Sequence, residues 1–245
     1  MNLPTEKTPI KTDLSDQTIL IYGAEKIGKS SFCAEMESAL FLATEAGLNH
    51  LNVHQVSIDS WESFVNACGS LKAGKHKFQT AIIDVIDKLY NHCLEYVCEK
   101  HGINHPADLS YGKGWALVNN EFSRVLTKLS LLPYGLVLVA HAKEQEFDER
   151  TGKYTKVLPN LSGGASKVVT GMSDFILYFT NEITTNGEDV SEKRVIYTKS
   201  NKFYDAGDRT GFLPESIDLN YPAFIKEYEI AIEKEIEKES EKENE

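Results

Sequence analysis

The chain has 245 residues, of which 41% are hydrophobic and 26% charged, and its formal charge is −11. This size and composition are typical of one soluble globular domain, and no apolar run approaches the roughly 20 residues that a membrane-spanning helix needs. No apolar leader precedes the first predicted strand, so we expect a cytoplasmic protein without a membrane partner, whose four cysteines stay reduced.

Strand-like and helix-like stretches alternate along the chain. Extended apolar segments are expected at residues 18–23, 39–44, 80–86, 135–142, 174–180 and 194–199, and helices at residues 29–38, 60–71, 87–100 and 115–132. Apolar strands separated by helices are typical of a parallel sheet that is buried on both faces. The sequence therefore predicts an α/β fold with helices on both faces of a mostly parallel sheet and a ligand at the carboxyl ends of the strands.

Residues 23–30, GAEKIGKS, match the pattern GxxxxGK[ST] between a predicted strand and a predicted helix. Glycines let the backbone wrap closely around phosphate, inward-pointing amides bind it, and the helix N-terminus favours an anion. We expect Lys29 to contact the β- and γ-phosphates of ATP and Ser30 to ligate Mg²⁺. The alternative is a chance Gly-rich turn. The residues expected to bind the nucleotide are Gly23, Ala24, Glu25, Lys26, Ile27, Gly28, Lys29, Ser30 and Ser31.

Asp84 ends the apolar segment TAIID. A carboxylate at a strand end beside a phosphate loop can hold Mg²⁺, as a Walker B residue does. Alternatively, Asp84 caps the next helix, and Asp87 in the same turn competes for either role.

Cys93, Cys98, His101 and His105 form a cluster of soft ligands that could close a tetrahedral zinc site. The spacing is not that of a standard zinc knuckle, and the two cysteines lie on different faces of a continuous helix. Buried cysteines and surface histidines are the alternative.

Residues 226–245 hold nine Glu and four Lys and predict an acidic tail, either a solvated helix or disordered. An acidic peptide that docks a partner is the other interpretation. The rest of the chain is only moderately acidic, which is compatible with a local basic groove.

With these motifs, the segment from Thr18 to Leu219 resembles the RecA-like ATPases, most closely the phage-encoded AAA family ATP-binding proteins described as the Sak group of single-strand annealing or recombination ATPases. The resemblance implies a RecA-like P-loop domain at residues 18–225, between an N-terminal extension at 1–17 and the tail, in the cytoplasm of a bacterial host.

The resemblance also implies roles for individual residues. Glu45, after the second strand, becomes the catalytic base, and His141, at the end of a later strand, becomes the γ-phosphate sensor. An exposed loop Glu and a surface His are the alternatives. Arg209 becomes an arginine finger that acts in trans on ATP bound between adjacent subunits of a ring or filament. Gly207 stands where the family has a Lys, which leaves Lys199 or Lys202 as a second cation.

Single-stranded DNA is the partner that the resemblance implies, with a single-strand DNA-binding protein as a further partner. Two segments without a strong period, 101–114 and 142–166, correspond to the family's DNA-binding loops. Tyr111 and Trp115 offer stacking faces, although Trp115 also suits the buried start of a core helix. In the second loop acidic residues nearly cancel the basic ones. The residues expected to contact DNA are Lys113, Trp115, Lys143, Arg150, Lys153 and Lys156.

The sequence thus favours an ATP-hydrolysing protein that acts in DNA recombination or single-strand annealing. A ring helicase or translocase motor of the same fold is one alternative. A second is an ATP-dependent switch that loads a partner and never touches DNA, and a small-molecule kinase is a third, although the chain lacks a recognisable Arg-rich lid.

Overall fold

The computed structural model describes residues 3, 5, 7–150, 152–186 and 189–244. Its α-helices are α1 (Lys29–Cys33), α2 (Trp61–Lys72), α3 (Ile86–His101), α4 (Lys113–Ser130), α5 (Gly163–Met172) and α6 (Tyr221–Asn244). Its strands are β1 (Thr18–Gly23), β2 (Ala39–Ala43), β3 (His54–Ser57), β4 (Thr80–Asp84), β5 (Gly135–Glu149), β6 (Gly152–Pro159), β7 (Phe175–Asn186), β8 (Asp189–Tyr197), β9 (Gly207–Asp208) and β10 (Ser216–Asp218).

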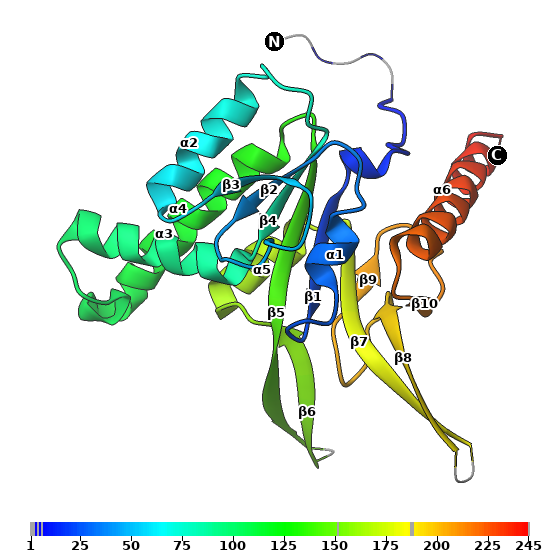
Figure 1. The fold of residues 1–245 in the computed structure, drawn as a ribbon. Helices are drawn as coiled ribbons and strands as arrows, with labels where there is room; N and C mark the ends of the chain where they lie inside the picture. The colour runs from blue at the N-terminus through cyan, green and yellow to red at the C-terminus, as the bar shows by residue number, and fades with distance from the viewer. Residues whose placement is uncertain (1–2, 4, 6, 151, 187–188, 245) are drawn as a thin grey trace.

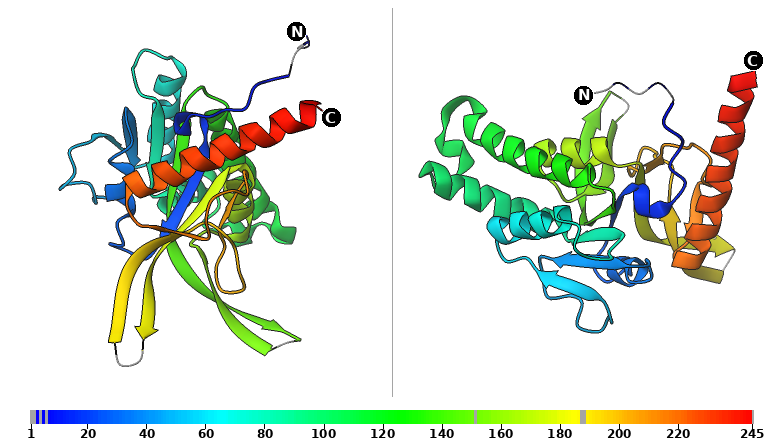
Figure 2. Two further views of the ribbon diagram at one scale, coloured as in Figure 1. Left: turned by 90° about the vertical axis from the view of Figure 1, so that its right-hand side faces the viewer. Right: turned by 90° about the horizontal axis from the view of Figure 1, so that it is seen from above.

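The strands form one sheet in the order β10-β8-β7-β1-β5-β4-β2-β3, with β6 beside β5 and β9 beside β7. The strands from β7 to β3 pair in parallel, and β6, β8, β9 and β10 pair antiparallel. Helices cover both faces of the sheet, as the two views of Figure 2 show. The predicted fold class is therefore confirmed, with antiparallel strands added to the parallel core.

Residues on β1 show how the two faces are filled. Leu20 and Tyr22 pack into a core that also contains Trp61 of α2 and Phe122 of α4. The alternate residues of β1 pack into a second core, which contains Phe32 of α1 and residues of α6. Since side chains of a strand alternate between faces, a strand buried on both faces is apolar throughout. All six residues of β1 are buried, which explains the unbroken apolar run.

Two long β-hairpins extend beyond the carboxyl ends of the central strands. β1 pairs with β5 as far as His141 and with β7 as far as Phe179, and both partner strands continue past these points. β5 turns back into β6 and β7 into β8, so the hairpins project on the same side of the molecule (Figure 1). Segment 142–166, expected to be a loop, is instead mostly hairpin and the start of α5. Its strand alternation was hidden because the side chains on both faces are largely polar.

α6 begins before the predicted tail and continues through its described part. Phe224, Tyr228, Ala231 and Ile232 are buried, so the first half of the helix packs on the domain. Its distal half extends away from the sheet (Figure 2). The helical form of the tail thus depends at first on apolar packing rather than on Glu–Lys pairs alone. Within the described residues, each helix is too short or too polar to span a lipid bilayer.

Candidate functional site

The phosphate-loop segment lies at the carboxyl end of β1, between the bases of the two hairpins. Gly23 is required there, because a Cβ atom on it would lie 2.4 Å from the carbonyl oxygen of Phe179. Gly28 has a φ of 118°, a conformation that glycine adopts without strain. Gly23 is thus required by the close approach of β1 to β7, and Gly28 by the backbone conformation at the start of α1.

Lys29 is only 7% exposed. Its Nζ atom donates to the carbonyl oxygens of Gly23 and Ala24, at 2.8 and 2.7 Å. Burial lowers the pKa of Lys29, and the nearby carboxylates of Asp84 and Asp87 oppose this effect. A buried ammonium with neutral backbone partners retains charge that a phosphate group can neutralise.

Ser30 and Asp84 form the second part of the site. The Oγ atom of Ser30 donates to Oδ2 of Asp84 at 2.7 Å, and Asp84 is 5% exposed. Burial raises the pKa of Asp84, while the bond from Ser30 lowers it. A hydroxyl and a carboxylate in contact offer the hard oxygen ligands that Mg²⁺ prefers, so the residues fit the expected ion.

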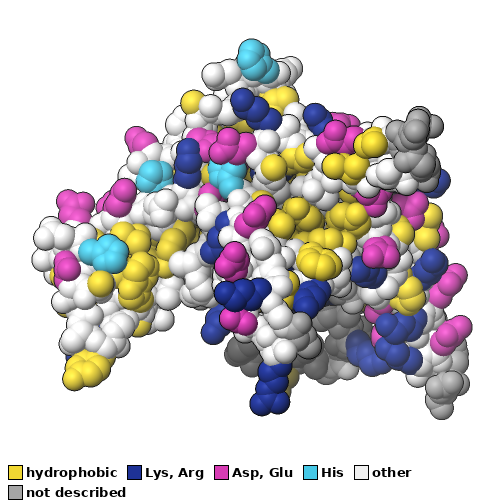
Figure 3. Space-filling model, turned by 90° about the horizontal axis from the view of Figure 1, so that it is seen from below, with side chains coloured by type: hydrophobic (Ala, Val, Ile, Leu, Met, Phe, Trp, Pro, Cys, Tyr) yellow, Lys and Arg dark blue, Asp and Glu magenta, His cyan; other side chains and the backbone are white. Residues whose placement is uncertain are grey.

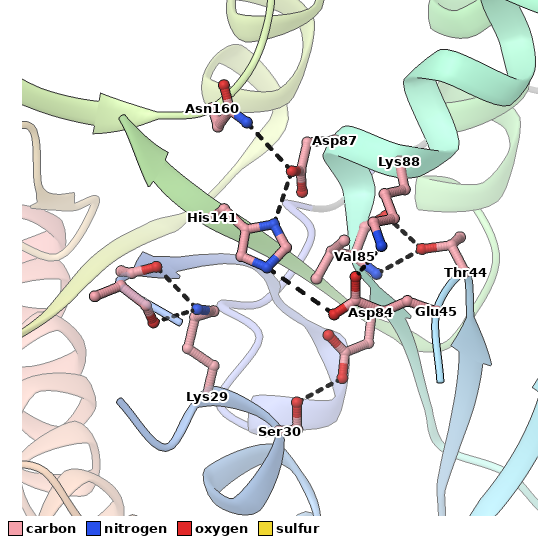
Figure 4. A network of polar contacts seen from close by, with 12 residues as sticks. Lys29, Ser30, Thr44, Glu45, Asp84, Val85, Asp87, Lys88, His141 and Asn160 are labelled. Carbon is pink, nitrogen blue, oxygen red and sulfur yellow. Dashed lines mark hydrogen bonds and ion pairs between the residues drawn. The ribbon is translucent and has the colours of Figure 1, made fainter. Parts of the chain in front are cut away.

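Glu45 follows β2 and faces the same cleft (Figure 4). Its Oε2 atom lies 2.6 Å from Nζ of Lys88, and this hydrogen bond raises the pKa of Lys88. The hydroxyl group of Thr44 donates to the carbonyl oxygen of Val85 and accepts from its backbone amide. These two hydrogen bonds join the ends of β2 and β4. Glu45 and Asp84 are thereby held at neighbouring strand ends.

His141 lies between two carboxylates. Its Nδ1 atom is 2.8 Å from Oδ2 of Asp87, and its Nε2 atom is 3.9 Å from Oε1 of Glu45. Asn160, just after β6, also approaches Asp87, with Nδ2 3.5 Å from Oδ2. These groups surround the cleft together with Lys29, Ser30 and Asp84 (Figure 4), and the cleft has a volume of about 830 Å³.

The structure thus brings together the predicted loop, Asp84, Glu45 and His141. Sequence reasoning missed Lys88 and Asn160, and it treated Asp87 only as a rival of Asp84. The position of Lys88, one helical turn after a strand-ending Asp, was the available signal for that residue. No sequence signal pointed to Asn160, because only the pairing of β5 with β6 brings it next to His141.

Arg209 lies far from this cleft. Its backbone amide bonds the carbonyl group of Asp174 just before β7, at the opposite end of the strand from the hairpin. Its Nε atom is 3.1 Å from the carboxylate of Asp174. The neighbouring cation Lys199 is paired with the buried Asp208 at 2.6 Å. A role for Arg209 at the nucleotide would therefore require a second subunit.

The first expected DNA loop is the connection between α3 and α4. Tyr111 is 97% exposed there and has a φ of 58°. Trp115 belongs to the first turn of α4, and its ring packs on His105 with the centroids 5.5 Å apart. Because α3 carries the chain 16 residues away from β4, about 24 Å of helix separates this connection from the cleft.

The zinc expectation is wrong for the described residues, which contain no group of three or more His, Cys, Asp or Glu side chains able to hold a metal ion. Cys93 is buried in the core against the carbonyl group of Val118. The ring of His105 instead accepts the amide proton of Ala107 at a 3-10 turn. Core packing and capping account for these residues.

Strand pairing partly separates the charges of the β5–β6 hairpin. Glu144, Glu146 and Asp148 alternate along β5 and share one face, which we call the acidic face. Phe147, together with its cross-strand partner Tyr154, lies on the other. The two rings stack with centroids 5.4 Å apart.

The same side as Phe147 and Tyr154 also carries Lys143 and Lys156, and we call it the aromatic face. Segment 199–206 lies beside it: Lys202 is over the Tyr154 ring, 4.4 Å from its centroid, and Lys156 pairs with Asp205 at 2.5 Å. Of the other expected cations, Lys153 is on the acidic face and Arg150 is exposed near the turn. Figure 3 shows several Lys and Arg side chains on the side toward which the hairpins project, mixed with acidic ones.

Comparison with known proteins gives two results. Residues 15–210 match a family described as an AAA domain. The chain is also 29% identical, over 186 residues, to an SPbeta prophage-derived uncharacterized protein YorG of Bacillus subtilis strain 168. This match covers 74% of the chain and 54% of the relative, so the chain spans about half the length of that curated protein.

Proposed function

Since the chain belongs to the AAA domain family, we propose that it hydrolyses ATP in the cleft beside residues 23–31 and that hydrolysis drives a reaction on single-stranded DNA. The observation that carries the ATPase part is the convergence of Lys29, the Ser30–Asp84 pair and Glu45 on one cleft. The family match supports a P-loop ATPase. The prophage origin of the relative supports a phage setting.

Each side chain has a proposed part in the reaction. Lys29 contacts the terminal phosphates of ATP, and its buried charge makes that contact strong. Ser30 and Asp84 hold Mg²⁺, which when bound neutralises charge on the transferring phosphoryl group. Glu45 accepts the proton of the attacking water, and His141 senses the γ-phosphate. The reaction products are ADP and phosphate.

The aromatic face of the β5–β6 hairpin supports the DNA part of the proposal. Stacked rings beside lysines suit a single strand, because every base has a face that can stack and every nucleotide has a phosphate. Three of the acidic residues that nearly cancel the charge of this segment lie on the opposite face, and the fourth, Glu149, lies beside Tyr154 and accepts its hydroxyl hydrogen bond. The hairpin can therefore present lysines and aromatic rings on one face although its net charge is close to zero.

Assembly is the third part of the proposal. We place ATP between adjacent subunits of a ring or filament, with Arg209 supplied by the neighbour as an arginine finger. Arg209 would have to exchange its contact with Asp174 for the phosphate. Residues 18–225 form the proposed ATPase domain, and residues 226–245 form its charged extension.

The ATPase and DNA parts are tested together by steady-state hydrolysis with and without single-stranded DNA, at low and moderate salt. DNA-stimulated activity that falls with salt is expected, since phosphate contacts release counterions. In mixtures of Arg209→Ala with Lys29→Ala subunits, activity recovers if the finger acts in trans, because one interface then has both residues intact.

A partner-loading switch without DNA remains the second candidate. The acidic face of the hairpin favours it, because exposed carboxylates repel a polyanion and suit a basic protein surface. Hydrolysis that is indifferent to DNA, together with absent DNA binding at low salt, would select this candidate. Unwinding of duplex DNA would select a helicase or translocase motor instead.

A further inference from the structure

Asp87 lines the cleft, and the reaction proposed above gives it no part. It is 10% exposed, and its Oδ1 atom is buried without a hydrogen-bond partner among the described residues. Its Oδ2 atom faces Nδ1 of His141 and Nδ2 of Asn160. A buried carboxylate oxygen without a partner is costly, which indicates a function rather than stabilisation.

Both partners of Asp87 lie at the base of the β5–β6 hairpin. His141 precedes the first hairpin pair, Ala142 with Pro159, and Asn160 follows it. The backbone amide of Asn160 also donates to the carbonyl oxygen of His141, at 2.8 Å. Asp87 on α3 therefore holds both strands of the hairpin at the point where they leave the sheet (Figure 4).

The same turn of α3 holds the proposed catalytic base. Lys88, adjacent to Asp87, binds Oε2 of Glu45, while the Nε2 atom of His141 faces Oε1. Because a carboxylate only accepts hydrogen bonds, Asp87 requires the proton of His141 to be on Nδ1. That choice leaves Nε2 directed at Glu45 and the cleft.

We propose that Asp87 is a positioning residue that couples the β5–β6 hairpin to Glu45, by fixing the orientation of His141 and binding Asn160. The inference rests on the proposed ATPase function. A DNA strand that moves the hairpin shifts His141 and Asn160 relative to Asp87. The shift reaches Glu45 through His141 and through Lys88, which adjoins Asp87. Hydrolysis thereby depends on the state of the hairpin, whose base contributes His141 and Asn160 to the cleft.

The test compares Asp87→Ala with the wild-type protein in three measurements. Nitrogen-15 NMR of labelled histidine, with His141 assigned from a His141→Gln variant, should show the Nδ1–H form in the wild type and its loss in the variant. The kcat for ATP should fall about 10- to 100-fold, the range expected when a base is misplaced. Affinity for a fluorescent ATP analogue should change less than about threefold, because Asp87 does not belong to the phosphate loop.

Two further variants sharpen the result. Asn160→Ala keeps the Asp87–His141 contact, so it should keep the Nδ1–H form and reduce stimulation by single-stranded DNA. Asp218→Ala, at an exposed position of strand β10, is the matched control and should behave as wild type. If Asp87→Ala does not fold, Asp87→Leu replaces it, since the leucine side chain is similar in size and accepts no hydrogen bond.

The inference is overturned if Asp87→Ala keeps wild-type kcat and DNA stimulation, or if His141 carries its proton on Nε2 in the wild type. These outcomes differ from failure of the proposed function. If the proposed function fails, the wild-type protein itself releases no more phosphate than the Lys29→Ala blank. The proposed coupling of the hairpin to hydrolysis then fails as well.

Discussion

Lys88 pairs with Glu45, with 2.6 Å between Nζ and Oε2. The carboxylate proposed to activate water is therefore held by a cation one helical turn beyond Asp84. The ammonium group is half-exposed and Glu45 is partly buried, so the pair lies at the mouth of the cleft rather than in the core. Such a pair contributes little to the free energy of folding. Its larger effect is to hold the Glu45 carboxylate in one orientation.

Replacing Lys88 with Met should separate these two effects. The free energy of unfolding should change by less than about 1 kcal/mol, because exposed ion pairs contribute that much at most. The kcat should fall about 3- to 10-fold as Glu45 loses its fixed orientation. Urea denaturation and phosphate release measure the two quantities. Lys100→Met, on the same helix but outside the cleft, is the control, and an equal loss in both variants would refute the role of Lys88.

Asp84→Asn should stabilise the nucleotide-free protein and inactivate it. Burial raises the folded-state pKa of Asp84 above that of the unfolded chain, so the folded protein binds the proton more tightly. Wild-type stability is therefore lost as pH rises from the unfolded through the folded pKa, and the neutral Asn escapes this loss. Asn still accepts the Ser30 hydrogen bond. Without a carboxylate for Mg²⁺, kcat should fall at least about 100-fold.

Denaturation in EDTA from about pH 4, near the pKa of an unfolded Asp, to about pH 8 measures the stability difference. The advantage of Asp84→Asn should grow toward higher pH and level off above the raised pKa. A variant less stable than wild type at pH 8 would contradict the burial argument.

Gly23→Ala should destabilise the fold by about 1–3 kcal/mol, the usual cost of forced overpacking. The new Cβ would lie 2.4 Å from a backbone oxygen of Phe179, which cannot move without disrupting the pairing of β1 with β7. Gly69→Ala in α2 is the control, because its Cβ meets nothing within 4 Å and alanine favours a helix. Thermal unfolding compares them, and similar melting temperatures would show that the close approach is not present.

Phe147→Ala should weaken binding of single-stranded DNA by about 5- to 150-fold, the equivalent of about 1–3 kcal/mol per stacked base. Thr155→Ala lies on the acidic face of the same hairpin and should bind as wild type does. Fluorescence anisotropy with a labelled oligonucleotide measures both affinities. Equal affinity of Phe147→Ala and wild type would remove the aromatic face from the DNA proposal.

The sequence predicts the parallel core because each central strand is buried on both faces. β1, β2 and β4 are short apolar runs, and the phosphate loop and Asp84 end two of them. Local signals are enough where one residue follows a strand in a recognised pattern. Glu45 needed the family resemblance as well, because ATEAG alone does not distinguish a catalytic residue from a loop residue.

The hairpins and the Asp87 network were not predictable by the same means. Polar residues on both faces of the β5–β6 hairpin remove the hydrophobic alternation that identifies a strand. The contact of Asn160 with Asp87 joins residues 73 positions apart and depends on the register of that hairpin. The zinc expectation failed for a related reason, since core burial of Cys93 is decided by tertiary packing.

The most direct test of the central claim is phosphate release from ATP by the wild-type protein, with Lys29→Ala as the blank and Glu45→Gln beside it. Mg²⁺-dependent turnover in the wild type, loss of nucleotide binding in Lys29→Ala, and retained binding without turnover in Glu45→Gln are predicted. Turnover that persists in Lys29→Ala, or full turnover in Glu45→Gln, would contradict the assignment of this cleft as the site of hydrolysis.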